Sequence, residues 1–154
     1  MLTGLVTVAL ASASCPVSPQ TLTVPVRGTV IERFLAPACE RCAGRRGIVV
    51  RVARPSPVLA TATGEVTFAG QVGGALWVVQ QVAPGVRVTY GRLSAIAERI
   101  ETGVQVPAGG ALGEAQERVY LGVRVGNVPR NPLGCWARRV RLAAANVGRR
   151  AAPR

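Results

Sequence analysis

The fold is decided by the stretch from Pro57 to Gly113, which reads PVLATATGEVTFAGQVGGALWVVQQVAPGVRVTYGRLSAIAERIETGVQVPAGGALG. Short runs of β-branched residues alternate here with glycine and proline, a pattern typical of consecutive antiparallel strands. The pattern predicts three strands and two turns. The strands are expected over residues 66–69, 76–81 and 86–90, and the turns at residues 73–74 and 84–85.

Two more strands are expected before this stretch. Residues 21–31 read as an opening strand that closes at Phe34, and residues 35–44 read as a loop. The segment 47–52, GIVVRV, has the β-branched density of a buried strand. A chain of 154 residues is long enough for one domain with its own core. The predicted fold class is therefore all-β, with antiparallel strands.

The charged residues exclude most catalytic chemistry. All 19 basic residues are Arg, all seven acidic residues are Glu, and the chain has no His. No Lys or His is present to activate a hydroxyl or a thiol. Arginine stays protonated at any working pH and cannot serve as a general base. The sequence therefore predicts no independent enzyme activity and no cofactor.

The net charge of +12 predicts attraction to polyanions. Anionic wall polymers and lipid headgroups are both candidates. The alternative interpretation is that Arg only replaces Lys and that the charge keeps the protein soluble. Nucleic acid is not expected as a partner, because no recognition-helix pattern and no basic motif interleaved with aromatic residues is present.

The N-terminal segment resembles part of a secretion signal. Residues 5–10 are apolar, and residues 11–13 are small, as at a cleavage site. A basic residue before the apolar run is missing, so two interpretations stay open: an exported chain whose true start lies upstream, or an apolar first strand. We expect export to the cell envelope, and no stretch is long enough for a transmembrane span. Cys15 is a weak candidate for lipid attachment, because Ser12 stands where a lipobox has Leu.

The four cysteines are candidates for disulfide bonds. Zinc needs four ligands, and without His the site would have to use all of them. An exported protein normally oxidises such cysteines to disulfides. The pairing stays open, because four cysteines allow three connectivities. The candidates are Cys15, Cys39, Cys42 and Cys135.

The order of segments resembles LytM/lysostaphin-type zinc endopeptidases of peptidoglycan, whose fold is a duplicated hybrid motif. The resemblance implies an antiparallel two-layer β-sandwich with a groove. Six family motifs have counterparts in this order, over about residues 24–134: G-x-H-R-G-[IV]-D, P-V-x-A-x-x-x-G-x-V-x-F-A-G, Y-x-H-L-S, x-G-x-x-V-x-A-G-x-x-I-G, H-x-H-F-E-[VIL]-R and N-P-L. The counterparts are Gly44 to Val49, Pro57 to Gly70, Tyr90 to Ser94, Gly103 to Gly113, Arg118 to Arg124, and Asn131 to Leu133.

The departures from the family fall on its chemistry. Arg45 stands at the first zinc-binding His, and Val49 stands at the Asp ligand. Arg92 replaces the His of Y-x-H, and Arg118 and Tyr120 replace the two His of H-x-H. The resemblance implies that the three arginines converge on the old site and repel a cation. It therefore implies a pseudo-peptidase whose vacated groove is used for binding.

The expected function is a regulator or scaffold of cell-wall hydrolysis, such as an activator of a peptidoglycan amidase. Two alternatives stay open: direct binding of peptidoglycan or another wall polymer, and a metalloendopeptidase whose metal site is misaligned. The expected organisation is a signal-like segment over residues 1–20, the LytM-like domain over 21–134 and an Arg/Ala-rich tail over 135–154. The expected groove residues are Arg45, Val49, Tyr90, Arg92, Arg118 and Tyr120.

Overall fold

A computed structural model of the chain describes Cys15, Val17 and residues 23–136. This part is built almost entirely of strands, with one helical turn at residues 133–136. The all-β prediction is confirmed. The strands are β1 (Thr29–Glu32), β2 (Gly47–Arg51), β3 (Ser56–Leu59), β4 (Gly64–Val72), β5 (Ala75–Ala83), β6 (Val86–Leu93), β7 (Ala95–Ile96), β8 (Gln105–Val106), β9 (Ala111–Ala115), β10 (Arg118–Val125) and β11 (Val128–Arg130).

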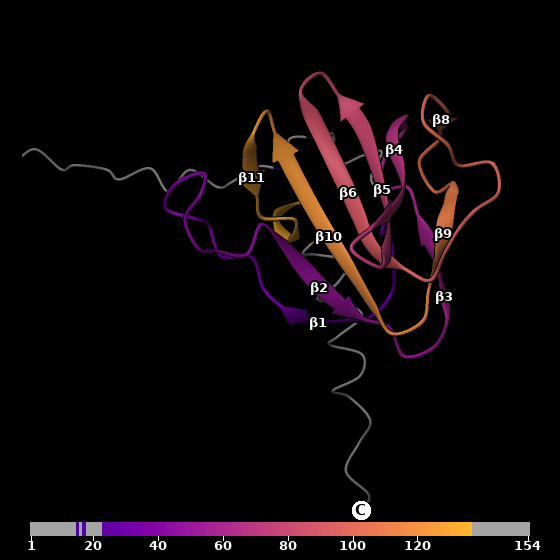
Figure 1. Ribbon diagram of the computed structural model, residues 1–154, viewed down its shortest axis with the longest axis horizontal. Coiled ribbons are helices and arrows are strands. Elements are labelled where there is room, and N and C mark those ends of the chain that lie inside the picture. The colour runs from indigo at the N-terminus through magenta and orange to yellow at the C-terminus, as the bar shows by residue number, and fades with distance from the viewer. Residues whose placement is uncertain (1–14, 16, 18–22, 137–154) are drawn as a thin grey trace, which may run out of the picture.

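The strands form two antiparallel sheets (Figure 1). The large sheet has the order β1-β2-β10-β6-β5-β4-β8, and β11 pairs with the end of β10. The small sheet has the order β3-β9-β7. Strand β10 lies between β2 and β6, so a late segment of the chain is inserted beside an early one. This insertion brings residues 47–51 and 118–125 together.

The central meander was predicted correctly from its turns. Strands β4, β5 and β6 contain the three expected strands, and the turns lie at 73–74 and 84–85. Gly73, Gly74 and Gly85 all have positive φ, which explains why glycine is needed there. The opening strand was predicted too long, since only β1 is regular. Before it, the Thr23 amide bonds the Thr61 carbonyl and the Pro25 carbonyl accepts from the Leu59 amide, which ties this segment to the small-sheet side.

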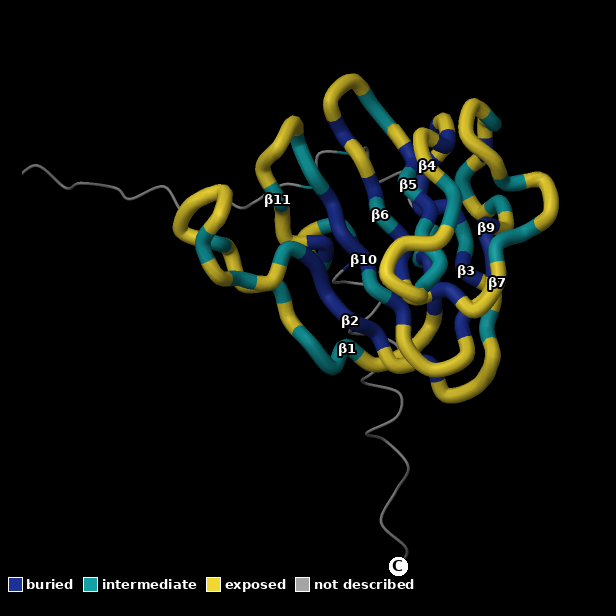
Figure 2. Tube along the Cα trace, in the orientation of Figure 1, coloured by how far each residue is buried: buried dark blue, intermediate teal, exposed yellow. Residues whose placement is uncertain are grey.

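The core lies on one face of the large sheet. Along β10, Val119, Leu121 and Val123 are buried, while Arg118 is exposed and Tyr120 is half-buried. The same alternation is visible along the tube in Figure 2. Residues from both sheets, including Val66, Val78 and Leu112, are fully buried in one cluster. The opposite face of the large sheet is therefore the candidate binding surface.

A polar network crosses this core. The Tyr90 hydroxyl accepts from the Thr61 amide at 2.9 Å and donates to Gln80 Oε1 at 3.3 Å. The Gln80 side-chain amide donates to three backbone carbonyls, those of Ala62, Gly64 and Val106. Burial raises the pKa of Tyr90, and the Thr61 hydrogen bond only partly offsets it. Tyr90 therefore stays protonated and joins β6, β5 and the loop before β4.

The C-terminal side of the domain extends further than expected. The sequence predicts that the chain leaves the scaffold after Leu133, yet Trp136 is only 3% exposed and belongs to the core cluster. Its indole Nε1 donates to Thr61 Oγ1 at 2.7 Å. The Arg- and Ala-rich composition after residue 136 concealed this anchor. The expectations for most of the signal-like segment and for the Arg/Ala-rich tail after residue 136 lie outside the described residues.

The cysteines form one of the three possible sets of pairs. Cys15 is bonded to Cys135, and Cys39 is bonded to Cys42. The Cys15 sulfur is thus used in a disulfide, which is incompatible with a lipid thioether on the same atom. Two disulfides are typical of a protein from an oxidising, extracytoplasmic compartment. Among the described residues, no helix has the length and hydrophobicity to cross a membrane.

Candidate binding groove

The face of the large sheet opposite the core is organised in rows of directly paired residues. Paired residues on neighbouring antiparallel strands point to the same face of a sheet. The central row crosses six strands and contains two aromatic residues, two glycines, one valine and one glutamate. In strand order from β1 to β4 it is Glu32, Val49, Tyr120, Gly91, Trp77 and Gly70.

The two aromatic rings of this row lie on glycines. A Cβ on Gly91 would overlap the Trp77 ring, and a Cβ on Gly47 would meet the Tyr120 ring at 2.6 Å. A Cβ on Gly122 would also lie close to the Tyr120 ring, at 3.1 Å. The ring centroids of Trp77 and Tyr120 are 5.4 Å apart with a tilt of 57°, a favourable geometry for an aromatic pair. The middle of this face of the large sheet is therefore an aromatic floor.

Polar residues flank the aromatic floor on one side. The next row still contains apolar residues, including Val79 and Phe68, and Phe68 is 38% exposed. The row after it is polar throughout. Across the sheet that polar row is Arg124, Arg87, Gln81, Glu65 and Gln105.

Tyr120 is half-buried and stays protonated at neutral pH. Burial raises the pKa of Tyr120, while the positive charges of Arg124 and Arg46 partly offset the increase. Its hydroxyl can therefore donate or accept a hydrogen bond. The two arginines that act on it come from β10 and from the end of the loop before β2.

Arginines border the aromatic floor, and all of them are exposed. Arg118 pairs directly with Arg51, so two arginines stand opposite each other at the end of the β2–β10 ladder. Arg92 follows Gly91 and has a φ of 59°, an uncommon conformation for a residue with a side chain. Arg45 Nε donates to the Arg33 carbonyl at 2.8 Å, which holds it at the end of β1.

Of the six expected groove residues, two lie in the central row, Val49 and Tyr120. Val49 pairs with Tyr120, and Arg92 and Arg118 are close neighbours of this row along the chain. Val49 is only 3% exposed, so it supports the floor and presents little surface. Arg45 lies at the β1 end. Tyr90 requires a correction: it is fully buried on the core face, because the alternation along β6 turns it away from the groove.

The sequence of the chain matches one known protein family. Residues 43–132, more than half of the chain, match peptidase family M23. The chain belongs to this family. The match covers β2 through β11 and so includes the central row from Val49 to Gly70.

Solved structures show the same fold for this M23 domain. Csd3 from Helicobacter pylori matches with a TM-score of 0.65 and 23% identity, over 82% of this chain and 40% of that one. A chain of the SpoIIQ–SpoIIIAH pore-forming complex matches with a TM-score of 0.64 and 18% identity, over 88% and 100%. The catalytic domain of lysostaphin from Staphylococcus simulans matches with a TM-score of 0.57 and 16% identity, over 69% and 90%.

These similarities concern the fold alone. The M23 domain spans about 40% of the length of the Csd3 chain that it matches. No curated protein sequence matches the chain significantly.

The residues at the metal positions of this M23 domain do not fit zinc. Val49 has no donor atom, the Arg45 guanidinium is a cation, and Tyr120 is a neutral phenol whose pKa is raised. In the described part of the chain, no group of three or more His, Cys, Asp or Glu is placed to hold a metal ion. No hydrolytic step through a metal can be derived from these residues.

Sequence reasoning missed Trp77, Arg51 and the glycine beneath the indole. The alternation within residues 76–81 carried the signal for Trp77, because it places Leu76, Val78 and Gln80 on the core face. Arg51 and Gly91 could not be assigned to the groove from sequence. Their place depends on the pairing of β2 with β10 and of β6 with β5, which no local pattern encodes.

Proposed function

We propose that this M23 domain is a non-catalytic protein of the bacterial cell envelope that regulates or scaffolds cell-wall hydrolysis. The observation that carries the proposal is the Trp77–Tyr120 pair, in which Tyr120 holds a position that the resemblance assigns to a zinc ligand. An aromatic floor with charged borders is a surface for binding.

The loss of catalysis follows from the donor set. A metallopeptidase needs a metal that polarises the scissile carbonyl and lowers the pKa of bound water. The positions of the metal ligands hold Arg45, Val49 and Tyr120. Neither arginine that replaces a catalytic His, Arg92 or Arg118, can act as a base.

The proposed partner is a protein with an acidic segment, such as a peptidoglycan amidase. Tryptophan, tyrosine and arginine are the residue types that dominate binding energy at protein interfaces. Guanidinium groups such as those of Arg51 and Arg118 bind carboxylates in bidentate fashion. The occurrence of a similar fold in the SpoIIQ–SpoIIIAH complex supports a role in protein assembly. The two disulfides support an extracytoplasmic location.

Direct binding of peptidoglycan is the second candidate. It is favoured by the basic borders of the groove and the net charge of +12, which attract anionic wall polymers. The two candidates differ in what the groove recognises: a protein segment in the first and the wall itself in the second.

Co-sedimentation with isolated peptidoglycan sacculi separates the two candidates. Under the main proposal, pelleting disappears as salt rises, because only diffuse charge attracts the domain. Pelleting that persists at high salt and is lost on Trp77→Ala would favour direct wall binding instead. Arg99→Glu is the charge control, since Arg99 is exposed in the loop between β7 and β8. Arg118→Glu changes the same charge at the groove.

A further inference from the structure

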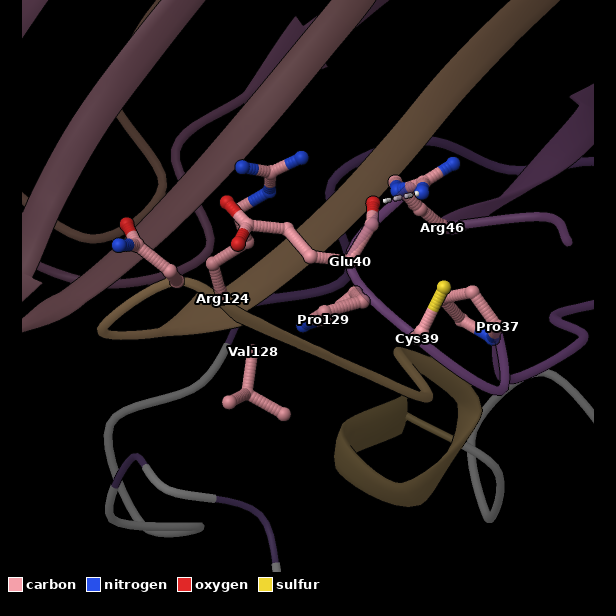
Figure 3. A pocket seen from close by; sticks show the side chains of 8 residues that line it. Pro37, Cys39, Glu40, Arg46, Arg124, Val128 and Pro129 are labelled. Atoms are coloured by element: carbon pink, nitrogen blue, oxygen red, sulfur yellow. Dashed lines mark hydrogen bonds between the residues drawn. The ribbon is translucent and has the colours of Figure 1, made fainter. Parts of the chain in front are cut away.

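A pocket of about 470 Å³ lies between the loop of residues 33–46 and the β10–β11 hairpin (Figure 3). Its volume is in the range of small-molecule sites. Arg46 and Arg124 supply its positive charges, and Glu40 supplies one negative charge. Val128, which is 55% exposed, and Pro129 form an apolar wall.

Arg46 is held in place by the loop that it closes. Its Nη2 donates to the Glu40 carbonyl at 2.6 Å and to the Cys42 carbonyl at 3.3 Å. The Cys39–Cys42 disulfide constrains the same loop, and Cys39 lines the pocket. A guanidinium group has five N–H donors, so the donors on Nε and Nη1 are not used by these two bonds. A preordered guanidinium loses less entropy when it binds an anion.

Arg124 completes the pair of cations. It is half-buried on β10, and its charge and that of Arg46 both reach Tyr120, where they lower the pKa against the effect of burial. Arg124 and Tyr120 lie on the same face of β10, so the pocket adjoins the aromatic floor, although the expected groove residues do not line it.

Glu40 lowers the net positive charge of the pocket, which bears on the charge of the ligand that fits it. Its carboxylate extends toward Arg124 in Figure 3. Two arginines and one glutamate leave the pocket with a single net positive charge, which matches a monoanion better than a phosphate dianion. The apolar wall gives room to a small side chain beside the anion. We propose that this pocket binds the terminal carboxylate of a short peptide, with Arg46 and Arg124 as its ligands.

This proposal does not depend on the proposed function of the groove. The carboxylate has two possible sources: the end of a wall stem peptide or the C-terminus of a protein. Stem peptides end in D-residues and proteins in L-residues, so the stereochemistry of a probe distinguishes the sources. The chemistry that recognises the carboxylate is the same for both.

Isothermal titration calorimetry of the full chain with the dipeptide N-acetyl-Ala-Ala tests the proposal. The L,L and D,D forms are compared with their C-terminal amides, which lack the charge. At least one acid should bind about tenfold or more tightly than its amide, the difference expected for a charge-assisted bidentate contact. Preference for D,D would indicate wall peptide, preference for L,L would indicate a protein terminus, and equal binding would support the shared carboxylate chemistry.

Three variants locate the binding. Arg124→Gln should weaken binding of the acid about tenfold or more, whereas Arg87→Gln should leave it unchanged. Arg87 pairs with Arg124 on β6 and does not line the pocket. Glu40→Gln should tighten binding, because it removes the competing carboxylate from an exposed loop position without disturbing the core.

The outcomes that would overturn the proposal are specific. Equal binding of acid and amide, tighter binding of inorganic phosphate than of the acid, or no binding of any acid at millimolar concentration would each do so. Weakening by Arg87→Gln equal to that by Arg124→Gln would show attraction by general charge and would also overturn it. A Cys39→Ser/Cys42→Ser double variant should bind more weakly, and unchanged affinity would remove the disulfide from the account.

Discussion

Trp77 and Tyr120 lie ring to ring across β5, β6 and β10, with their centroids 5.4 Å apart and Gly91 beneath the indole. Tyr120 stands at the position of a zinc ligand in the family motif, and its direct neighbour on β2 is Val49, at the position of another. We therefore propose that this face carries aromatic surface in place of metal donors. The glycines that accommodate the rings come from three strands, β2, β6 and β10.

Gly91→Ala should disrupt the aromatic floor. The new methyl group would overlap the indole of Trp77, so the ring must move. We expect a loss of about 1–3 kcal/mol in the free energy of unfolding, as for other overpacked sites, together with a shift in tryptophan fluorescence. Urea denaturation measures the first. Gly70→Ala is the matched control in the same row, since its methyl group would only touch Phe68 at 3.4 Å; equal loss in both variants would contradict this account.

Tyr90→Phe should destabilise the domain by about 1–3 kcal/mol. The change leaves Gln80 Oε1 and the Thr61 amide without the hydroxyl as a partner in a buried position, and unsatisfied buried groups cost this much. Tyr120→Phe is the control, because the Tyr120 hydroxyl forms no hydrogen bond within the described residues. Chemical denaturation compares the two. A smaller loss for Tyr90→Phe than for Tyr120→Phe would show that the network contributes little.

The free energy of unfolding should fall above pH 10. Burial raises the pKa of Tyr90 above its ordinary value of 10.0, so the folded state retains a proton that the unfolded state loses. The contribution of Tyr90 is complete below pH 10 and decreases above it, by about 1.4 kcal/mol per pH unit while only the unfolded state is ionised. Equilibrium unfolding between neutral pH and pH 11 measures this slope. Tyr90→Phe should flatten it, and an unchanged slope in that variant would assign the effect to other groups.

Restoring the ligands should restore zinc binding. The triple variant Arg45→His, Val49→Asp and Tyr120→His returns three donors to the positions of the family motif. We expect zinc to raise its melting temperature in proportion to occupancy, and no such shift for the natural sequence. Thermal unfolding with and without zinc measures both. An equal rise in the melting temperature of the natural sequence would mean that the zinc site has been assigned to the wrong residues.

The parts of the fold that sequence predicted are those that local chemistry determines. Glycines with positive φ mark both turns of the β4–β6 meander, so its strands could be located within a few residues. Tyr90 was misplaced because the family motif was read without the alternation along residues 86–93, which turns Val86, Val88 and Tyr90 into the core. That error was avoidable.

Other features depend on long-range pairing and could not be predicted. The bond between Cys15 and Cys135 joins residues 120 positions apart. The contact of Trp136 with Thr61 spans 75 positions, and the Arg-rich composition around it pointed to a solvated tail. The approach of Arg46 to Arg124 likewise follows from the insertion of β10 beside β2, which no local pattern encodes.

The release of soluble fragments from peptidoglycan sacculi tests the central claim most directly. The assay compares the chain alone with zinc, an envelope amidase from the same organism alone, and the two together. We predict no release by the chain alone, more release by the mixture than by the amidase, and loss of that stimulation on Trp77→Ala. Release of peptide-cleaved fragments by the chain alone in the presence of zinc would contradict the account.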